Sequence, residues 1–390
     1  MISIHTVLRT FVLIISILVI GCGPSLSKQN TSNPYWATSN PQTEGIDAQA
    51  LDAIDQDIKN GKYGLIDQFL VIKNEKLVYD KAYHHDYHTL LKADDTTSHQ
   101  YNYNHPDWHP FYNSTKLHTI QSVTKSIISL LIGIAADEGL MIPLDSTVYS
   151  LFPEYRFAFS DERKKSITLN DLLTMRSGIE WDESSSYADE QNNNGTIMEQ
   201  SDDWIRYVLE RPMDTLPGTT FVYNSGVPVL LGKIISNTTG KQVDKWAEEK
   251  LFGPLGITEY YWKKAPKGEI DTQGGLYLST YDLAKIGYLM LNKGVWENKQ
   301  IVSKDWIEKS TQPSAKLSDQ VAYGYQWWIP EYENDSTKIF AGNGYGNQYL
   351  MMSEEHHMLV VFNGWNIHEE TEKSAWKALQ DRILPALKNN

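Results

Sequence analysis

The chain has 390 residues, of which 41% are hydrophobic and 22% are charged. This is an ordinary globular composition, with enough length for one large domain or two modest ones. The formal net charge of −14 repels a phosphate backbone and therefore excludes nucleic acid as an expected partner.

The N-terminus has the pattern of an export signal. Arg9 is the only Lys, Arg, Asp or Glu among the first 27 residues, and residues 11–20 are apolar except for Ser16. A short positive region followed by a short apolar run is typical of a secretory signal, and the run is too short for a comfortable membrane span.

Cys22 is the only cysteine, which excludes an intramolecular disulfide. It follows an apolar-apolar-Gly triplet, and this pattern resembles the lipobox of bacterial lipoproteins. The resemblance implies that residues 1–21 are removed and that Cys22 carries a lipid. The protein would then be anchored in the bacterial cell envelope, on the periplasmic or outer surface of a membrane. The alternative is an ordinary signal peptide with an incidental cysteine.

Residues 22–45 are rich in Ser, Thr, Asn and Pro, a composition that predicts a flexible tether. A single folded domain is then expected over residues 46–390. Its first feature is a hairpin pattern at 69–83, with two β-rich runs around Lys73–Lys76. Residues 84–117 have no periodicity and are predicted to form a long surface loop.

Helical patterns dominate the middle of the chain. After Ser122 an apolar run covers every face of a helix that is expected to be buried and to end near Gly139. Thr168 and Ser279 each stand three residues before an Asp, which is the pattern of a capping box. The two helices are predicted to end near Gly178 and Gly294, respectively.

The last part of the chain returns to strands. Residues 348–352 and 358–362 are apolar runs around a polar turn, and Trp376, Leu379, Ile383 and Leu387 have helical spacing. We therefore predict an α+β fold in which an antiparallel sheet is built from both chain ends. Its two parts are about 46–121 and 270–390, flanked by helices, with a helical insertion at about 122–269.

Ser122 and Lys125 form a candidate nucleophile and base. Residues i and i+3 share one face of a helix, and a serine hydroxyl needs a base beside it to act as a nucleophile. Burial of the helix start would lower the pKa of Lys125, and the helix N-terminus offers backbone N–H groups to an oxyanion. The alternative is an N-cap serine next to a surface lysine, because S-x-x-K is common by chance.

Two further segments are candidates for the same site. Tyr223 and Ser225 lie two residues apart in "PGTTFVYNSG", so both side chains can point into one cleft, where a phenol can carry a proton. Gly342, Gly344 and Gly346 precede a strand and would let the backbone pass close to a substrate. Taken singly, the tyrosine segment is better explained as a buried tyrosine in a turn, and the alternative for the glycines is a glycine-rich turn.

In this order, S-x-x-K, Y-x-[NS] and a glycine-rich strand resemble the serine β-lactamase and penicillin-binding superfamily. The segments "ITLNDLLTMRSGIEWDE" and "GGLYLSTYDLAKIGYLMLNKG" are similar to those of class C β-lactamase-related hydrolases. That group includes esterases, D-amino-acid peptidases and 6-aminohexanoate-oligomer hydrolases. The resemblance covers about residues 60–385.

The resemblance implies a role for each matching residue and no cofactor. Ser122 would form the acyl-enzyme, with Lys125 as its base and Tyr223 as the proton relay. Ser225 and Asn343 would support the site with polar groups, and the N–H groups of Ser122 and Tyr345 would form the oxyanion hole. The implied substrate is a small or peptide-like ester or amide.

Two departures from the family pattern bear on the substrate. Gly342-Asn343-Gly344 aligns with a Lys-Thr-Gly or His-x-Gly motif, so a cation that helps to hold the carboxylate of a β-lactam is missing. Ser225 replaces the usual Asn. Both favour an ester or amide over an antibiotic, and β-lactamase or D-Ala-D-Ala carboxypeptidase activity remains the alternative.

Two other readings are weaker. His84, Asp86 and His88 in "HHDYH" suggest a metal site, but no zinc-type spacing accompanies them, so no metal is predicted. A non-catalytic lipoprotein that binds cell-wall peptide would keep the fold without turnover. A protein of that kind has no chemical reason to retain Ser122, Lys125 and Tyr223 together.

Overall fold

The computed structural model describes residues 35–90, 92–93, 116–189, 191–331, 337–367 and 371–387, without the side chain of His88. Residues 1–35 form one unit and Trp36–Asn390 a second, compact unit, which is described below. The predicted signal, Cys22 and the first part of the tether lie outside the described residues. So does most of the loop predicted at 84–117.

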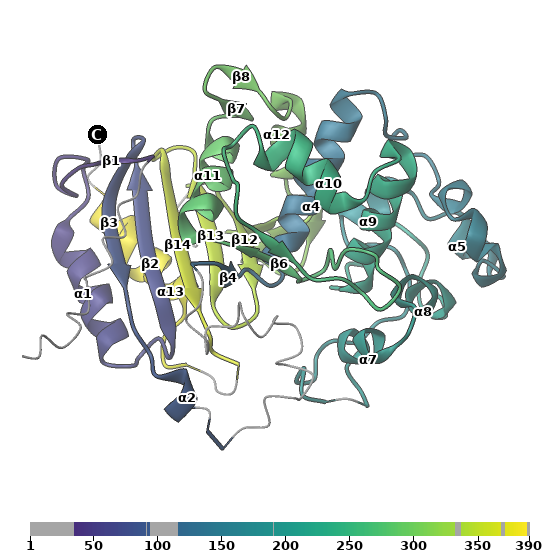
Figure 1. Cartoon of the computed structure of the whole chain (residues 1–390), viewed down its shortest axis with the longest axis horizontal. Coiled ribbons are helices and arrows are strands. Elements are labelled where there is room, and N and C mark those ends of the chain that lie inside the picture. Colours follow the sequence, from purple (N-terminus) through teal and green to yellow (C-terminus); the bar gives the residue numbers. More distant parts are fainter. Residues whose placement is uncertain are drawn as a thin grey trace, which may run out of the picture. The chain divides into compact units, whose positions relative to one another are not determined.

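The centre of the compact unit is a sheet made from both chain ends (Figure 1). Within the described residues its strand order is β1-β3-β2-β14-β13-β12-β11-β10-β9, with antiparallel pairing except between β1 and β3. This confirms the predicted α+β fold, with one parallel edge pair that the sequence did not indicate. The strands are β1 (Ala37–Thr38), β2 (Ile66–Lys73), β3 (Lys76–Ala82), β9 (Ala315–Lys316), β10 (Val321–Tyr323), β11 (Trp328–Pro330), β12 (Ile339–Gly344), β13 (Gln348–Ser353) and β14 (Met358–Gly364).

The edge strand β1 corrects the predicted end of the tether. Ala37 and Thr38 pair with β3, and Trp36 is buried against the ring of Tyr288. Residues 36–45 therefore belong to the folded unit. The otherwise polar segment contains one large indole, and burial of that ring helps to stabilise β1 on the sheet.

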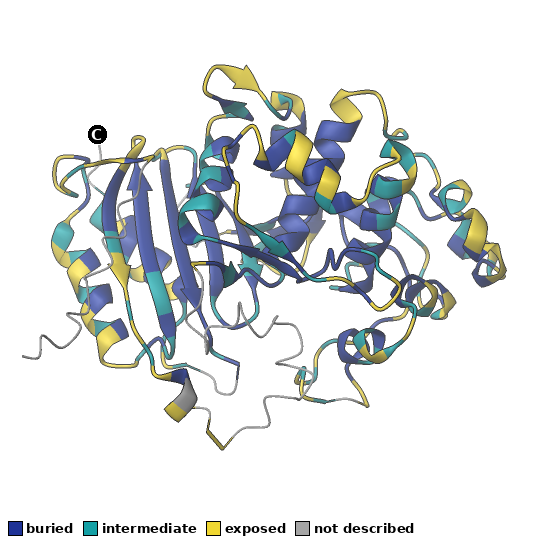
Figure 2. Ribbon diagram, in the orientation of Figure 1, coloured by how far each residue is buried: buried dark blue, intermediate teal, exposed yellow. Residues whose placement is uncertain are grey.

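The predicted hairpin at 69–83 is β2 and β3. The turn between them places Asn74 and Glu75 at φ angles of 51° and 63°, as a two-residue type I′ hairpin turn requires. Side chains of β2 alternate between two cores. Leu70 faces one core and Phe69 and Val71 face the other, so the sheet is buried on both sides (Figure 2).

Helices cover both faces of the sheet (Figure 1). On one face lie α4 (Val123–Asp137) and α11 (Thr280–Leu291), which contact β12, β13 and β14. On the other face lie α1 (Ala48–Lys59) and the C-terminal helix. That helix begins as α13 (Ala375–Ala378) and continues as η5 (Leu379–Ile383) and η6 (Leu384–Ala386).

The helical insertion packs around α4. Its members in the described residues are η2 (Tyr149–Leu151), η3 (Pro153–Ala158), α5 (Glu162–Lys165), α6 (Leu169–Leu173), α7 (Asn194–Gln200), α8 (Trp204–Glu210), α9 (Gly226–Thr239), α10 (Val243–Ala247) and η4 (Glu248–Phe252). The capping box at Thr168 is confirmed, but α6 ends at Leu173 and not near Gly178. Met175 has a φ of 55°, a left-handed conformation that cannot continue a helix.

Shorter elements complete the unit. A small sheet has the order β4-β6-β5, with β4 (His118–Thr119), β5 (Tyr261–Trp262) and β6 (Leu276–Leu278). The remaining elements are α2 (Tyr87–Leu90), the hairpin β7 (Val295–Trp296) and β8 (Lys299–Gln300), and α12 (Lys304–Ser310). Within the described ranges, no helix combines the length and the apolar character that a membrane crossing needs.

Candidate active site

Ser122 lies at the start of the buried helix α4, shortly after strand β4. It occupies the N-cap position with φ −63° and ψ −6°, and its side chain makes no capping hydrogen bond. The preceding residue, Gln121, has a φ of 45°, which is uncommon for a residue with a side chain. This tight turn presents the hydroxyl of Ser122 to a cleft and leaves it available to another group.

Lys125 is that group. Its Nζ lies 2.7 Å from Ser122 Oγ and 2.7 Å from the carbonyl oxygen of Gln273, and the residue is only 1% exposed. Burial lowers the pKa of Lys125 to about 8, against the opposing charges of Glu183 and Asp271. A substantial fraction of the amine is therefore neutral near pH 8 and can accept a proton.

Tyr223 reaches the same point from the loop before α9. The Lys125 Nζ lies 5.2 Å from the centroid of the Tyr223 ring, and that ring stacks on Trp328. Burial raises the pKa of Tyr223, as does the charge of Glu183, while a hydrogen bond with Ser122 lowers it. The phenol is thus protonated at neutral pH and lies in contact with the serine hydroxyl.

Glu183 organises the polar side of the site and was not predicted from the sequence. Its carboxylate accepts hydrogen bonds from the N–H of Ser225 (2.9 Å) and the hydroxyl of Ser225 (3.0 Å). The indole of Trp181 (2.6 Å) and the phenol of Tyr187 (3.3 Å) donate to the same carboxylate. Ser225 therefore contributes to the site by holding Glu183, whose charge raises the pKa of Lys125 and of Tyr223.

A cavity of about 390 Å³ opens above Ser122 at the end of β12. Tyr345 lies in its wall, and neither the N–H of Tyr345 nor that of Ser122 donates a hydrogen bond to another described residue. The cavity is lined by Ser122, Tyr187, Tyr223, Trp328, Asn343, Gly344, Tyr345, Gly346, Asn347, Tyr349, Asn366 and Thr371.

The three predicted cleft glycines have different surroundings. Gly344 and Gly346 line the cavity. A Cβ at Gly344 would lie 2.5 Å from the carbonyl oxygen of Ile120, so glycine lets β12 approach the segment before Ser122. The expectation for Gly342 is corrected, because this residue is buried and a Cβ there would lie 2.7 Å from Val123 Cγ1. Asn343, predicted as a supporting polar group, also lines the cavity.

Comparison with known proteins identifies the family. The family model described as "Beta-lactamase" matches residues 63–380, which is most of the chain. The chain belongs to the β-lactamase family. The predicted superfamily is thereby confirmed, together with the fold class of a mixed helix and strand protein whose sheet is flanked by helices.

Two relatives of this chain carry the names of different activities. One relative is a protein of Escherichia coli (strain K12) that is provisionally named a D-alanyl-D-alanine carboxypeptidase. It is 23% identical to this chain, over 91% of this chain and 90% of its own length. The 6-aminohexanoate-dimer hydrolase of Paenarthrobacter ureafaciens is 24% identical, over 68% of this chain and 70% of its own length.

A solved structure confirms the fold. It is that of a Bacillus anthracis protein with a provisional 6-aminohexanoate-dimer hydrolase name, with 21% identity and a TM-score of 0.67. The match covers 89% of this chain and 85% of that one. At this identity the match shows the β-lactamase fold alone.

The structure brings together Ser122, Lys125, Tyr223, Ser225 and Tyr345, as expected from the family motifs. The segment "SGIEWDE" contained Glu183, but a single sequence gave no reason to prefer it to the neighbouring acids. The metal reading of "HHDYH" rests partly on His88, whose side chain is outside the described set, and that reading stays untested.

Proposed function

We propose that the protein is a serine hydrolase that cleaves an ester or amide bond through an acyl-enzyme on Ser122. The observation that carries the proposal is the 2.7 Å contact between Ser122 Oγ and Lys125 Nζ. Lys125 is buried and has a pKa of about 8. A base needs a pKa near the working pH to take a proton and to release it again.

In the acylation step, neutral Lys125 takes the hydroxyl proton while Ser122 Oγ bonds to the carbonyl carbon of the substrate. The carbonyl oxygen becomes an oxyanion. The N–H groups of Ser122 and Tyr345 border the cavity and donate to no other described residue, so they are available to bind it. Fixed backbone dipoles of this kind stabilise the developing charge without reorganising.

Collapse of the intermediate needs a proton at the leaving atom. Tyr223 holds a proton because burial raises its pKa, and it is in hydrogen-bond contact with Ser122. It can donate to the leaving nitrogen or oxygen and be reprotonated from the Lys125 ammonium beside its ring. In deacylation the same groups take the proton from water, by the reverse path.

The lining of the cavity favours an uncharged reacting group. Among the described residues that line it, none is Lys, Arg, His, Asp or Glu. A carboxylate such as that of a β-lactam would find no cation there. We therefore propose a neutral ester or amide as the substrate and expect slow or absent turnover of nitrocefin. Rapid nitrocefin hydrolysis by the unaltered protein would favour the β-lactamase alternative.

Gly342→Lys would introduce the cation of the Lys-Thr-Gly motif, but for a steric reason it is not expected to give β-lactam turnover. The new Cβ would press against Val123, the first residue of α4. Real Cβ atoms do not approach a neighbour this closely, so the Val123 side chain next to Ser122, or β12 itself, must shift. Loss of esterase activity in Gly342→Lys, without a gain in nitrocefin turnover, is the predicted result.

The deciding experiment is intact mass after treatment with a fluorophosphonate. We expect one adduct on the native protein and none on Ser122→Ala. The matched control is Ser126→Ala, because Ser126 is buried one turn further along α4 and donates to the Gln326 carbonyl. An adduct of undiminished yield on Ser122→Ala contradicts the assignment. Absence of any adduct, and of any ester turnover, supports the non-catalytic binding protein.

We also propose that Cys22 carries the lipid anchor of this hydrolase, on the strength of the triplet before it. The native protein should sediment with membranes, and Cys22→Ala should yield a soluble or unprocessed form. A native protein that is found wholly in the soluble fraction contradicts the anchor and leaves the proposed chemistry intact.

A further inference from the structure

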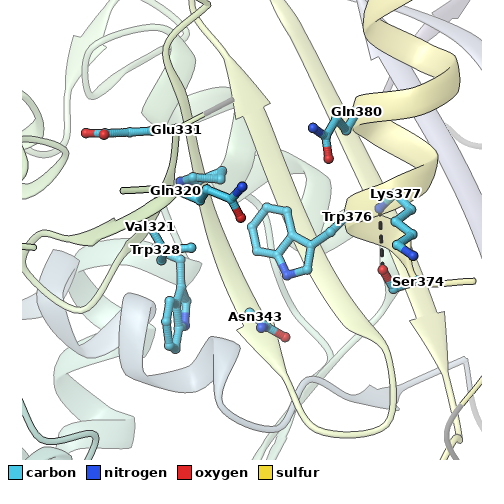
Figure 3. A pocket seen from close by; sticks show the side chains of 10 residues that line it. Gln320, Val321, Trp328, Glu331, Asn343, Ser374, Trp376, Lys377 and Gln380 are labelled. Atoms are coloured by element: carbon cyan, nitrogen blue, oxygen red, sulfur yellow. Dashed lines mark hydrogen bonds between the residues drawn. The ribbon is translucent and has the colours of Figure 1, made fainter. Parts of the chain in front are cut away.

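A second cavity, of about 400 Å³, adjoins the catalytic cavity and shares Trp328 and Asn343 with it. One wall comes from β10 and β11, and the other from α13 and η5. Figure 3 shows the indole of Trp376 projecting from the helix toward Gln320, with Asn343 below it. The two cavities are therefore neighbouring compartments with a common wall.

The common wall is aromatic on both sides. The Trp328 ring stacks on Tyr223 with centroids 5.6 Å apart, and the Trp376 ring meets Tyr349 edge-on at 5.3 Å. Tyr223 and Tyr349 both line the catalytic cavity. Each indole of the second cavity thus packs on a tyrosine of the first, and a group bound in the second cavity would lie one ring away from Tyr223.

The polar groups of the second cavity are uncharged or balanced. The amide side chains of Gln320, Asn343 and Gln380 border it and hydrogen-bond to no other described residue. The charged residues that border it are one base and one acid, Lys377 and Glu331, and both are exposed. Two indoles with amides at the edges suit a flat, apolar, uncharged group that carries a few hydrogen-bonding atoms.

We propose that the second cavity binds the leaving group of the substrate, and that this group is a flat, uncharged, apolar moiety of more than one ring. The inference rests on the proposed function. It places the leaving group here because Tyr223 delivers a proton to the leaving atom, and Trp328, which stacks on Tyr223, lines both cavities.

The kinetic test compares two acetate esters whose phenols are matched in acidity, one with a single ring and one with a biphenyl. The native protein should favour the biphenyl ester by about tenfold in kcat/KM, because the second ring is buried between the indoles. Gln320→Trp fills the cavity from an exposed position, and Trp376→Ala removes one wall. Both variants should bring the ratio of the two kcat/KM values close to one.

The control variant is Phe157→Ala, which removes a ring that is 58% exposed on η3, in the helical insertion. The preference should persist in that variant. If the native protein shows no preference for the larger leaving group, or if Gln320→Trp keeps the full preference, the inference is wrong. Preference for a larger acyl group in place of a larger leaving group would likewise overturn it.

A binding measurement separates this inference from the catalytic proposal. Calorimetry with 4-phenylphenol and the Ser122→Ala protein should show binding that disappears when Gln320→Trp is added to the same protein. Full esterase activity in Ser122→Ala would refute the acyl-enzyme while this binding result stood. Undiminished binding with the cavity filled would refute the second cavity as the site while the Ser122 chemistry stood.

Discussion

The starts of α4 and α11 use the same residue type in opposite ways. Ser279 caps α11 in extended conformation, accepting from the Asp282 N–H at 3.1 Å and donating to the Asp282 carboxylate at 2.7 Å. Ser122 starts α4 in helical conformation, makes no capping bond, and accepts from Lys125. The hydroxyl of Ser279 stabilises α11, whereas the hydroxyl of Ser122 does not cap α4 and contacts Lys125.

The difference teaches how a helix terminus becomes reactive. A capping serine is worth about 1 kcal/mol to a helix, and α4 forgoes this contribution because it is buried on all sides. Ser225 repeats the pattern at α9, where it starts the helix without capping it and binds Glu183. The site therefore contains two serines that occupy the N-cap positions of buried helices but make no capping hydrogen bond.

The largest expected effect is on Ser122→Ala. This variant should lose at least about a thousandfold in ester hydrolysis, because a nucleophile and its base act as a unit. Its stability to denaturant should stay close to native, since no cap is lost. Activity near the native level, or a stability loss as large as that of a missing cap, would break the distinction between the two helices.

The next largest effect is expected for Tyr223→Phe, which should slow amide hydrolysis much more than hydrolysis of activated esters. The variant keeps the ring that stacks on Trp328 but loses the proton. Amide hydrolysis should fall about a hundredfold, as expected for loss of a general acid. Hydrolysis of p-nitrophenyl esters should change little, since p-nitrophenolate leaves unprotonated. An equal fall for both substrates would remove Tyr223 from the leaving-group role.

A smaller effect, on pH dependence, is expected for Glu183→Gln. Ester hydrolysis by the native protein should rise with pH through about 8 as Lys125 loses its proton. The Glu183 charge raises that pKa, so its removal lowers the pKa. Neutral amine is then available at lower pH, and the rising limb of kcat/KM should move to lower pH.

The matched control for this prediction is Glu180→Gln. Glu180 lies three residues before Glu183, is exposed, and forms an ion pair with Arg211. That variant should leave the limb in place. An unmoved limb in Glu183→Gln would show that Glu183 holds Ser225 without tuning Lys125.

The smallest effect closes the comparison. Ser279→Ala should cost about 1 kcal/mol of unfolding free energy, measured by denaturant titration, with ester hydrolysis unchanged. Ser279→Thr should restore most of the loss, because the threonine hydroxyl can accept from the Asp282 N–H and donate to the Asp282 carboxylate as serine does. A fall in activity without a fall in stability would contradict the structural role of Ser279.

Local sequence rules predicted the elements that local forces decide. The turn at Asn74 and Glu75, the cap at Thr168 and the buried run after Ser122 each follow from neighbours in the chain. The ends of α6 and of the tether were wrong. Met175 ends α6 through its left-handed backbone conformation, and Trp36 packs against the Tyr288 ring of α11. Neither feature can be predicted from residues nearby in the sequence.

The site was predicted only as far as the family motifs reach. Ser122, Lys125 and Tyr223 could be expected together from their spacing and order. Glu183 could not, because its importance comes from its contacts with Ser225 and with the charge of Lys125, which only the fold brings close to it. Gly342 was misplaced because a glycine that serves a cleft and one that serves a helix contact look the same in sequence.

Construction of the sheet from both chain ends has a consequence for the order of synthesis. A chain that emerges from its N-terminus presents Ser122 and Lys125 early, but the N–H of Tyr345 arrives 223 residues later. The strand just before Tyr345, β12, is connected to β2 only through β13 and β14. Under the proposed mechanism the nucleophile therefore lacks the Tyr345 N–H as an oxyanion donor until nearly the whole polypeptide has been synthesised, and a nascent or truncated chain is catalytically silent.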